Sequence, residues 1–194
     1  MADLYAIAGN VERARLMLEA GVPYLQLRFK DRPLSPHRPE IAAWPARYPR
    51  TRLIVNDDLA FAIAVGAWGC HLGQEDTMRY APGDLRRAPL QVGISTHDDA
   101  EIARALELGA AMIGFGPIFR TGTKSVSHAP QGVARLAEVV RAVSLPVIAI
   151  GGITPENLAP VVETGVAMVA MVSALDRYDT PESLGPLMAA LRGK

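Results

Sequence analysis

The sequence predicts a single (β/α)8 barrel, or TIM barrel, over residues 1–194, and three observations favour this fold. Eight short apolar segments alternate with eight helical or partly helical segments along the chain. Most of these apolar segments are apolar on both faces, as is typical of buried parallel strands. An open doubly wound sheet is disfavoured because the chain has eight repeats and no GxGxxG motif after the first strand.

The expected elements follow in order along the chain. Short apolar runs predict strands at 3–8, 23–29, 53–56, 68–73, 90–95, 111–116, 145–152 and 167–174. Helical periodicity and helix-ending glycines predict helices at 11–20, 58–66, 98–109, 132–143, 155–165 and 181–193. The remaining stretches predict a proline-rich loop with a short helix at 30–49, a short helix broken near Pro82 at 77–89, and a long loop at 117–131.

Two helix starts carry capping signals. Asn10 can cap the helix at 11–20, which has Val11, Ala14 and Leu18 on one face. Thr96 with Asp99 resembles a capping box at the start of the helix at 98–109.

The segment 53–76 organises the predicted site. It contains two consecutive strands joined by a helix, and each strand is followed by an acid, Asp57 or Asp76. Strands joined in this way lie parallel in one sheet, so their carboxyl ends emerge on the same side. We therefore expect Asp57 and Asp76 to face one shared crevice.

Composition excludes several classes of function. The chain has 20 basic and 20 acidic residues, so its charge provides no attraction for nucleic acid or an anionic membrane, and small molecules are the expected partners. The single cysteine, Cys70, is interpreted as a core residue of a protein from a reducing compartment. No secretory signal and no uncharged apolar run of membrane-spanning length occur, so we expect a cytoplasmic location. Homo-oligomerisation stays open.

Polar residues collect where the predicted strands end, which is where barrels of this class place their active sites. The alternation in LQLRFK puts Gln26, Arg28 and Lys30 on one face, directed into the barrel mouth. The other strand-end candidates are Asn56, Asp57, Gln74, Glu75, Asp76, Ser95, Thr121, Thr123, Lys124, Gly151, Gly152 and Ser173.

These residue types suit a diphosphate bridged by Mg²⁺. Mg²⁺ takes one or two carboxylates together with phosphate oxygens, and Asp57 and Asp76 could supply the carboxylates. Arg28, Lys30 and Lys124 would neutralise the remaining phosphate charge. The Gly-Gly pair after the seventh strand and Ser173 after the eighth lie where barrels commonly bind a phosphate monoester.

Each candidate also has a structural interpretation. Asp57 or Ser95 could cap the following helix, and Asp76 or Lys124 could be solvated. Arg28 and Lys30 could form ion pairs at the barrel rim, and the glycine pair could serve only a tight turn. His71, His97 and His128 could each be structural, His37 lies in the proline-rich loop, and no two histidines have zinc-like spacing. Coincidence at seven strand ends is nevertheless improbable.

Seven motifs together resemble the thiamine phosphate synthase family. In chain order they are QLRFK, LIVNDD, HLGQED, VGIST, GFGPIFRTGTKS, AIGGI and AMVS. The resemblance covers almost the whole chain, and HLGQED together with GPIF and TGTK is its specific part. It implies a (β/α)8 barrel that joins hydroxymethylpyrimidine diphosphate to a thiazole phosphate, forming thiamine phosphate and releasing diphosphate.

The resemblance also implies residue roles. Asp57 and Asp76 look like the Mg²⁺ ligands, and Gln26 like a contact to the pyrimidine. The diphosphate would be held by Arg28, Lys30, Asn56, Ser95 and Lys124, of which Arg28, Lys30, Ser95 and Lys124 are the catalytic set. Thr121 and Thr123 look like substrate contacts, and the thiazole phosphate pocket would be formed by Gly151, Gly152, Val172 and Ser173. The implied chemistry is dissociative and demands no general base.

Two other functions stay open on this sequence. Thiazole tautomerases share the barrel but use a histidine where this chain has Pro117, although His128 lies further along the same loop. A barrel that only binds thiamine precursors, as a regulator, would not need Asp57, Asp76 or Lys124.

Overall fold

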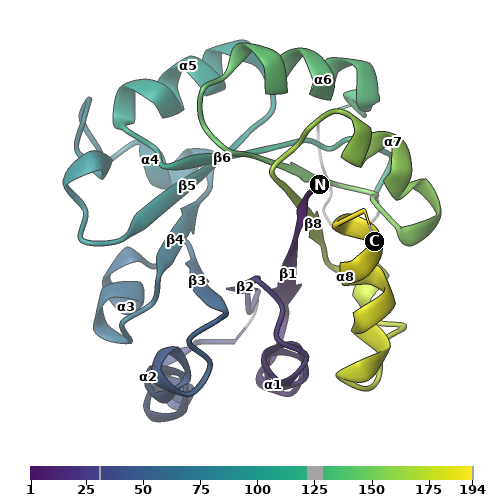
Figure 1. Ribbon diagram of the computed structural model, residues 1–194. Coiled ribbons are helices and arrows are strands. Elements are labelled where there is room, and N and C mark those ends of the chain that lie inside the picture. The colour runs from purple at the N-terminus through teal and green to yellow at the C-terminus, as the bar shows by residue number, and fades with distance from the viewer. Residues whose placement is uncertain (31, 122–128, 194) are drawn as a thin grey trace.

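Eight parallel strands close into a barrel in the computed structural model, which describes residues 1–30, 32–121 and 129–193. Each strand pairs with the next along the chain, and the last pairs with the first. Figure 1 shows the helices surrounding these strands, so the predicted (β/α)8 barrel is confirmed. The strands are β1 (Asp3–Ala8), β2 (Tyr24–Leu27), β3 (Arg52–Asn56), β4 (Gly69–Leu72), β5 (Gln91–Thr96), β6 (Met112–Phe115), β7 (Val147–Ile150) and β8 (Met168–Met171).

The connections are helical. The α-helices are α1 (Val11–Glu19), α2 (Arg38–Arg47), α3 (Leu59–Ala64), α4 (Gln74–Thr77), α5 (Asp99–Leu108), α6 (Gly132–Ala142), α7 (Leu158–Glu163) and α8 (Gly185–Leu191). Short 3-10 turns add η1 (Ser35–His37), η2 (Leu85–Arg87), η3 (Pro155–Asn157), η4 (Ser173–Leu175) and η5 (Glu182–Leu184). Within the described ranges, no helix has both the length and the apolarity to cross a membrane.

The core has two parts because every strand is buried on both faces. In β1, Leu4 and Ala6 pack outward under the helices, whereas Tyr5 and Ile7 point into the barrel. The interior cluster continues with Ile54, Met112, Ile148, Met168 and Ala170. This inner filling closes the barrel axis, so the space available to a ligand lies at one end.

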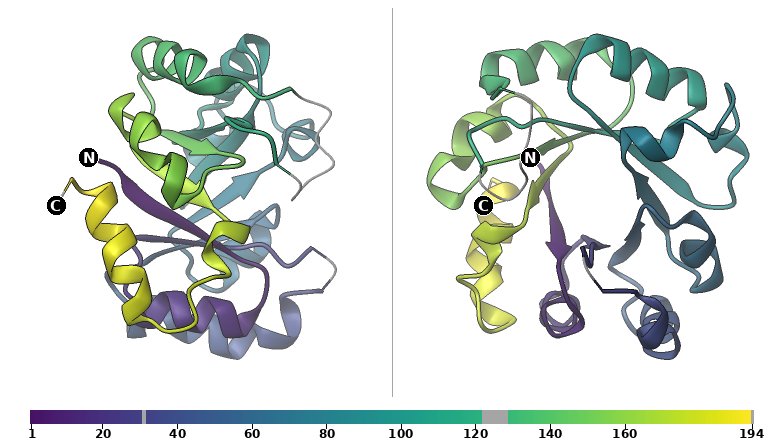
Figure 2. Two further views of the ribbon diagram at one scale, coloured as in Figure 1. Left: turned by 90° about the vertical axis from the view of Figure 1, so that its right-hand side faces the viewer. Right: turned by 180° about the vertical axis from the view of Figure 1, so that it is seen from behind.

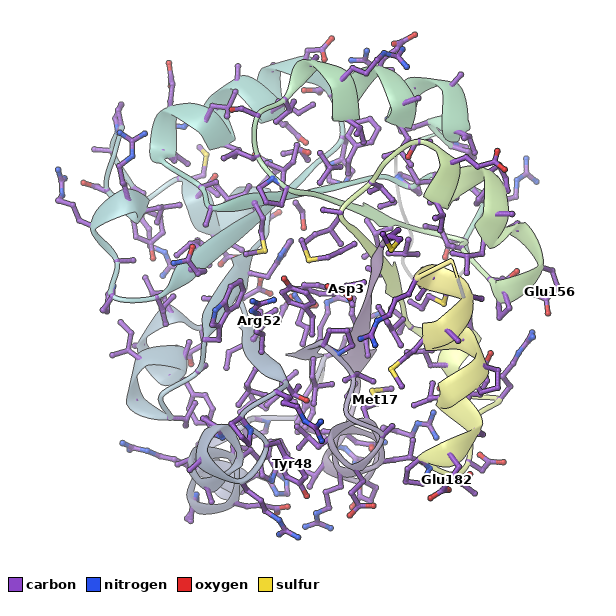
Figure 3. The ribbon with its side chains drawn as sticks, viewed as in Figure 1. Asp3, Met17, Tyr48, Arg52, Glu156 and Glu182 are labelled. Carbon is purple, nitrogen blue, oxygen red and sulfur yellow. The ribbon has the colours of Figure 1, made fainter. Side chains whose placement is uncertain are left out.

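Aromatic packing fills the end where the strands begin. The Arg52 guanidinium carbon lies 5.0 Å from the ring centroid of Tyr24 and 5.3 Å from that of Trp68, and its Nη1 donates to the Tyr24 hydroxyl at 2.6 Å. Figure 3 shows Arg52 near the middle of the ring of strands. Both termini lie side by side at this end (Figure 2), where the Ala2 N–H donates to the Leu191 carbonyl at 2.8 Å.

The structure corrects several local predictions. The capping box of Thr96 and Asp99 is wrong: Asp98 caps α5 by accepting from the Glu101 N–H at 2.9 Å. The Thr96 side chain is buried within the sheet and donates to the Gly114 carbonyl at 3.0 Å instead. The helix expected at 77–89 starts earlier, as α4, and only η2 forms within the later part of that range. Strand β2 ends at Leu27 rather than at residue 29.

The cap predicted at Asn10 is confirmed. Its side chain accepts from the Arg13 N–H at 2.8 Å, and Val11, Ala14 and Leu18 are buried as expected.

Candidate active site

Asp57 and Asp76 meet at one point beyond the ends of β3 and β4. The Gly73 N–H lies 3.3 Å from Asp57 Oδ1 and 3.3 Å from Asp76 Oδ2, so the two carboxylates share a single donor. The second Asp57 oxygen accepts from the Asn56 side-chain amide, and Asp76 Oδ1 lies 3.3 Å from Arg79 Nη2. The acids expected to face one crevice therefore lie side by side.

The backbone of Asp57 adopts an unusual conformation to reach this position. Its φ is +63°, and within the described part of the chain it is the one non-glycine residue with positive φ. Left-handed backbone is uncommon for residues with a side chain, although aspartate and asparagine tolerate it best. Strain of this kind concentrates at functional sites, where the surrounding structure holds it in place.

Electrostatics of the pair disfavour two negative charges in the metal-free protein. Partial burial of the Asp57 carboxyl raises its pKa, and the neighbouring negative charge of Asp76 raises it further. The Gly73 N–H and the charge of Arg28 act in the opposite direction without cancelling the rise. A bound cation would relieve this repulsion.

A cavity of about 210 Å³ opens beside the acid pair at the carboxyl ends of the strands. It lies where barrels of this class place their active sites. Ten of the predicted site residues line it: Gln26, Arg28, Asn56, Asp57, Ser95, Thr121, Gly151, Gly152, Val172 and Ser173. The two proposed anion sites thus belong to one continuous cavity.

Of the four remaining residues with a predicted role in the site, the structure describes two, Asp76 and Lys30. Asp76 stands at the rim behind Asp57 and does not line the cavity wall. Lys30 is exposed and also outside the lining, because β2 ends three residues before it and the strand alternation no longer directs its side chain. Thr123 and Lys124, together with His128, lie outside the described residues.

Two of the structural interpretations are wrong. Asp58, not Asp57, caps α3, because its side chain accepts from the Phe61 N–H at 2.8 Å. Ser95 does not cap α5, whose cap is Asp98. Both candidate residues are therefore available for other roles.

Ser95 is held from the β4 side by two residues that the sequence did not single out for this purpose. The His71 ring Nε2 lies 3.1 Å from Ser95 Oγ, and the Gln74 side-chain amide donates to the Ser95 carbonyl at 2.5 Å. Glycines on the adjoining strands make room for the ring, since a Cβ at Gly93 would lie 2.7 Å from His71 Nδ1. His71 is thus a barrel-interior residue beside the cavity.

Gln26 is oriented by an interior tyrosine. Its Nε2 donates to the Tyr5 hydroxyl at 3.2 Å, which leaves the amide oxygen as the acceptor for a ligand. Burial raises the pKa of Tyr5 well above its ordinary value, so the hydroxyl stays protonated. Gln26 therefore offers a fixed acceptor at the bottom of the cavity.

Two glycines after β7 shape the opposite wall. Gly151 and Gly152 have φ of +98° and +67°, and a Cβ on Gly152 would lie 2.5 Å from the Arg120 carbonyl oxygen. Glycine is therefore required here by conformation and by space. The Asn157 side chain donates to the Gly152 carbonyl at 2.9 Å and holds the turn in place.

An ion pair joins the loops after β7 and β8 on the outside. Arg177 Nη1 donates to Glu156 Oε1 at 2.5 Å, and Figure 3 shows Glu156 at the periphery of the molecule. Hydrogen bonds from the side chains of Thr154 and Arg177 lower the pKa of Glu156 to about 2. Both side chains are exposed, so this is a surface link between the two loops.

His97, which lines the cavity just before α5, contacts Glu101 in the first turn of that helix. Glu101 Oε2 accepts from the His97 N–H at 2.7 Å and lies 2.8 Å from its ring Nδ1. The Gln131 side chain donates to the His97 carbonyl at 2.7 Å and links the start of α6 to the end of β5. In the sequence, the signal for this contact was the four-residue spacing of His97 and Glu101, but that spacing predicts only that the two side chains lie close together.

The donor set of the acid pair fits a hard divalent cation. Two carboxylates converge on the Gly73 N–H, and the repulsion between their charges favours a positive charge beside them. No group of three or more His, Cys, Asp or Glu side chains in the described ranges could hold a metal. A pair of carboxylates, completed by water and phosphate oxygens, is the arrangement typical of Mg²⁺ rather than Zn²⁺.

Comparison with known proteins identifies the family. The family model described as thiamine monophosphate synthase matches residues 4–175. The chain belongs to this family. The predicted family is therefore confirmed, and with it the expectation that the chain is a transferase of thiamine biosynthesis.

Curated relatives of the thiamine monophosphate synthase family agree over most of their length. The thiamine-phosphate synthase of Cronobacter sakazakii is 45% identical over 175 residues, covering 89% of this chain and 83% of the relative. That of Serratia proteamaculans is 41% identical over 195 residues, covering 98% and 92%.

Solved structures give the same family and fold. The thiamine phosphate pyrophosphorylase of Pyrococcus furiosus superposes with a TM-score of 0.79 at 28% identity, covering 97% of this chain and 96% of that one. The 3-hexulose-6-phosphate synthase of Salmonella typhimurium reaches 0.70 at 16% identity, covering 97% of each chain. That second similarity shows the barrel fold alone.

Proposed function

We propose that the chain transfers the hydroxymethylpyrimidine group from its diphosphate to thiazole phosphate, in a Mg²⁺-dependent reaction that forms thiamine phosphate. The observation that carries the proposal is the convergence of Asp57 and Asp76 on the Gly73 N–H at the rim of the cavity. The names of the curated thiamine-phosphate synthases support the same reaction.

In this proposal the diphosphate lies against the acid pair. Mg²⁺, when bound, would neutralise diphosphate oxygens and so favour departure of the leaving group. Asp57 and Asp76 would hold the cation, while Arg28 and the Ser95 hydroxyl, both in the cavity wall, would bind phosphate oxygens directly. Asn56 would act beside them and also orient Asp57 through its side-chain amide.

Lys30, Lys124 and Thr123 remain part of the proposed site. Lys30 would reach the diphosphate from the exposed segment after β2, and the other two belong to the loop outside the described residues. Thr121, which lines the cavity, would contact the substrate from the same loop.

The reacting groups are positioned without a general base. The C–O bond between the pyrimidine methylene and the diphosphate breaks, and its electron pair leaves with the diphosphate. The thiazole nitrogen lone pair then forms the new C–N bond, so no proton has to be removed. Gln26 would fix the pyrimidine through its amide oxygen, and positioning and charge stabilisation would supply the catalysis.

The thiazole phosphate would bind on the opposite wall. Gly151 and Gly152, whose φ angles are positive, line this wall and would offer backbone N–H groups to the phosphate, and Val172 and Ser173 border the same space. In this proposal the two substrates would bind at opposite ends of one cavity.

The two alternatives have less support. Residue 117 is proline, so this chain lacks the histidine that thiazole tautomerases use at that position. A regulator that only binds thiamine precursors would have no use for the acid pair.

One assay separates the three functions. The purified chain is incubated with the pyrimidine diphosphate, thiazole phosphate and Mg²⁺, and thiamine phosphate and diphosphate are quantified. We expect equal amounts of both products, and neither when one substrate is omitted or a chelator is in excess. Turnover of a thiazole carboxylate phosphate alone would indicate a tautomerase, and binding without turnover would indicate a regulator.

A further inference from the structure

Gln74 crosses from the start of α4 to the end of β5. Its side-chain amide donates to the Ser95 carbonyl at 2.5 Å, while its own carbonyl accepts from the Thr77 hydroxyl at 2.6 Å. Gln74 is partly buried and does not line the cavity. Any effect it has on the substrates must therefore pass through a neighbour.

The sheet register explains why this hydrogen bond is needed. The last residue pair between β4 and β5 is Leu72 with Ile94, after which the chain turns into α4. Ser95 lies beyond that pair, so β4 has no backbone N–H opposite its carbonyl. The Gln74 amide supplies the missing donor and continues the ladder by one residue.

The same short segment carries the acid pair. Gly73 donates to both Asp57 and Asp76, and Gln74 follows it directly. Asp76 lies two residues beyond Gln74 in the single turn of α4. One segment of four residues thus sets the position of a carboxylate and of the Ser95 backbone.

We propose that Gln74 is a positioning residue for the transfer reaction, which fixes the Ser95 hydroxyl relative to the acid pair. This inference rests on the proposed function, in which Ser95 and the acids bind the same diphosphate. The Gln74 hydrogen bond holds the backbone of Ser95, and the His71 ring lies against its hydroxyl at 3.1 Å. Loss of the Gln74 bond would leave Ser95 able to move away from the diphosphate.

The variant Gln74→Met tests this, because methionine keeps the length of the side chain and removes the donor. We expect kcat/KM for the pyrimidine diphosphate to fall about tenfold, as for loss of one well-placed hydrogen bond. KM for thiazole phosphate should stay unchanged. The control is Gln91→Met, at the exposed opposite end of β5, which should behave as the wild type.

A double-mutant cycle with Ser95→Ala distinguishes positioning from general stabilisation. If Gln74 acts through the Ser95 hydroxyl, Gln74→Met should reduce kcat/KM less than twofold in the Ser95→Ala background. A full tenfold loss in that background, or no loss in the wild-type background, would overturn the inference. An inactive wild type would instead contradict the proposed function. If Gln74→Met does not fold, Gln74→Asn, whose amide is one methylene too short, takes its place.

Discussion

Asp57 offers the sharpest test because its charge and its backbone conformation can be changed separately. Asp57→Asn removes the negative charge but keeps an oxygen for the Gly73 N–H, and asparagine tolerates φ of +63°. Asp57→Ala removes the charge and the acceptor and places alanine in the left-handed region. The two variants therefore share a loss of function and differ in stability.

The expected energies follow from these contacts. Two unit charges 4 Å apart repel by about 1 kcal/mol in water-like surroundings. Asp57 is exposed as a whole although its carboxyl is partly buried, so water screens much of this repulsion, and we expect metal-free Asp57→Asn to be more stable than the wild type by about 0.5 kcal/mol. Left-handed backbone costs about 1 to 2 kcal/mol for a residue such as alanine. Asp57→Ala also loses the charge repulsion, so it should be less stable than the wild type by about 0.5 to 1.5 kcal/mol.

Urea unfolding with and without Mg²⁺ measures both effects. At a Mg²⁺ concentration ten times its dissociation constant, the wild type should gain about 1.4 kcal/mol, and neither variant should gain. Turnover of both variants should fall by about 10² to 10³. The reasoning is refuted if Asp57→Asn is destabilised as much as Asp57→Ala, or if Mg²⁺ stabilises the Asn variant as well as the wild type.

Three further predictions concern the supporting structure. Gly116→Ala should destabilise the fold by about 3 kcal/mol, because the new Cβ would lie 2.1 Å from a β7 carbonyl oxygen. In the control, Gly185→Ala, the new Cβ meets nothing within 4 Å, so this variant should be nearly neutral. The urea concentrations at the unfolding midpoints of the two variants measure the difference. Burial raises the pKa of the Cys70 thiol to about 12, so at pH 8 iodoacetamide should label it only after unfolding, and rapid labelling of the folded chain would contradict this. Because hydrogen bonds lower the pKa of Glu156 from 4.5 to about 2, its contribution to stability should be complete above pH 4.5 and lost as the pH falls toward 2. The difference in unfolding midpoint between Glu156→Gln and the wild type should shrink over that range, and a constant difference would refute the assignment.

The fold was predictable because its signals are local. Short apolar runs separated by helices leave few topologies, and parallel connection alone places residues such as Asp57 and Ser95 at one end of the barrel. Asp57 and Asp76 were expected to share a crevice from this reasoning, and they meet on one N–H group.

The errors arose where tertiary contacts decide an element's end. Strand alternation was extended to Lys30, but β2 stops at Leu27 and the later side chain is exposed. Thr96 has the chemistry of a cap, yet it is still part of β5 and its hydroxyl is used within the sheet. Asp57 reaches the Gly73 N–H that it shares with Asp76 through a left-handed backbone conformation, and the hydrophobic periodicity of a sequence does not predict such a conformation.

Manganese binding tests the central claim most directly. Mn²⁺ can replace Mg²⁺ as a paramagnetic probe, and electron paramagnetic resonance measures how much of it is bound when inorganic diphosphate is present. We predict one bound ion per chain in the wild type and in Glu75→Gln, an exposed acid beside the pair, and none in Asp57→Asn or Asp76→Asn. Equal binding by all four proteins would contradict a metal site formed by these two carboxylates.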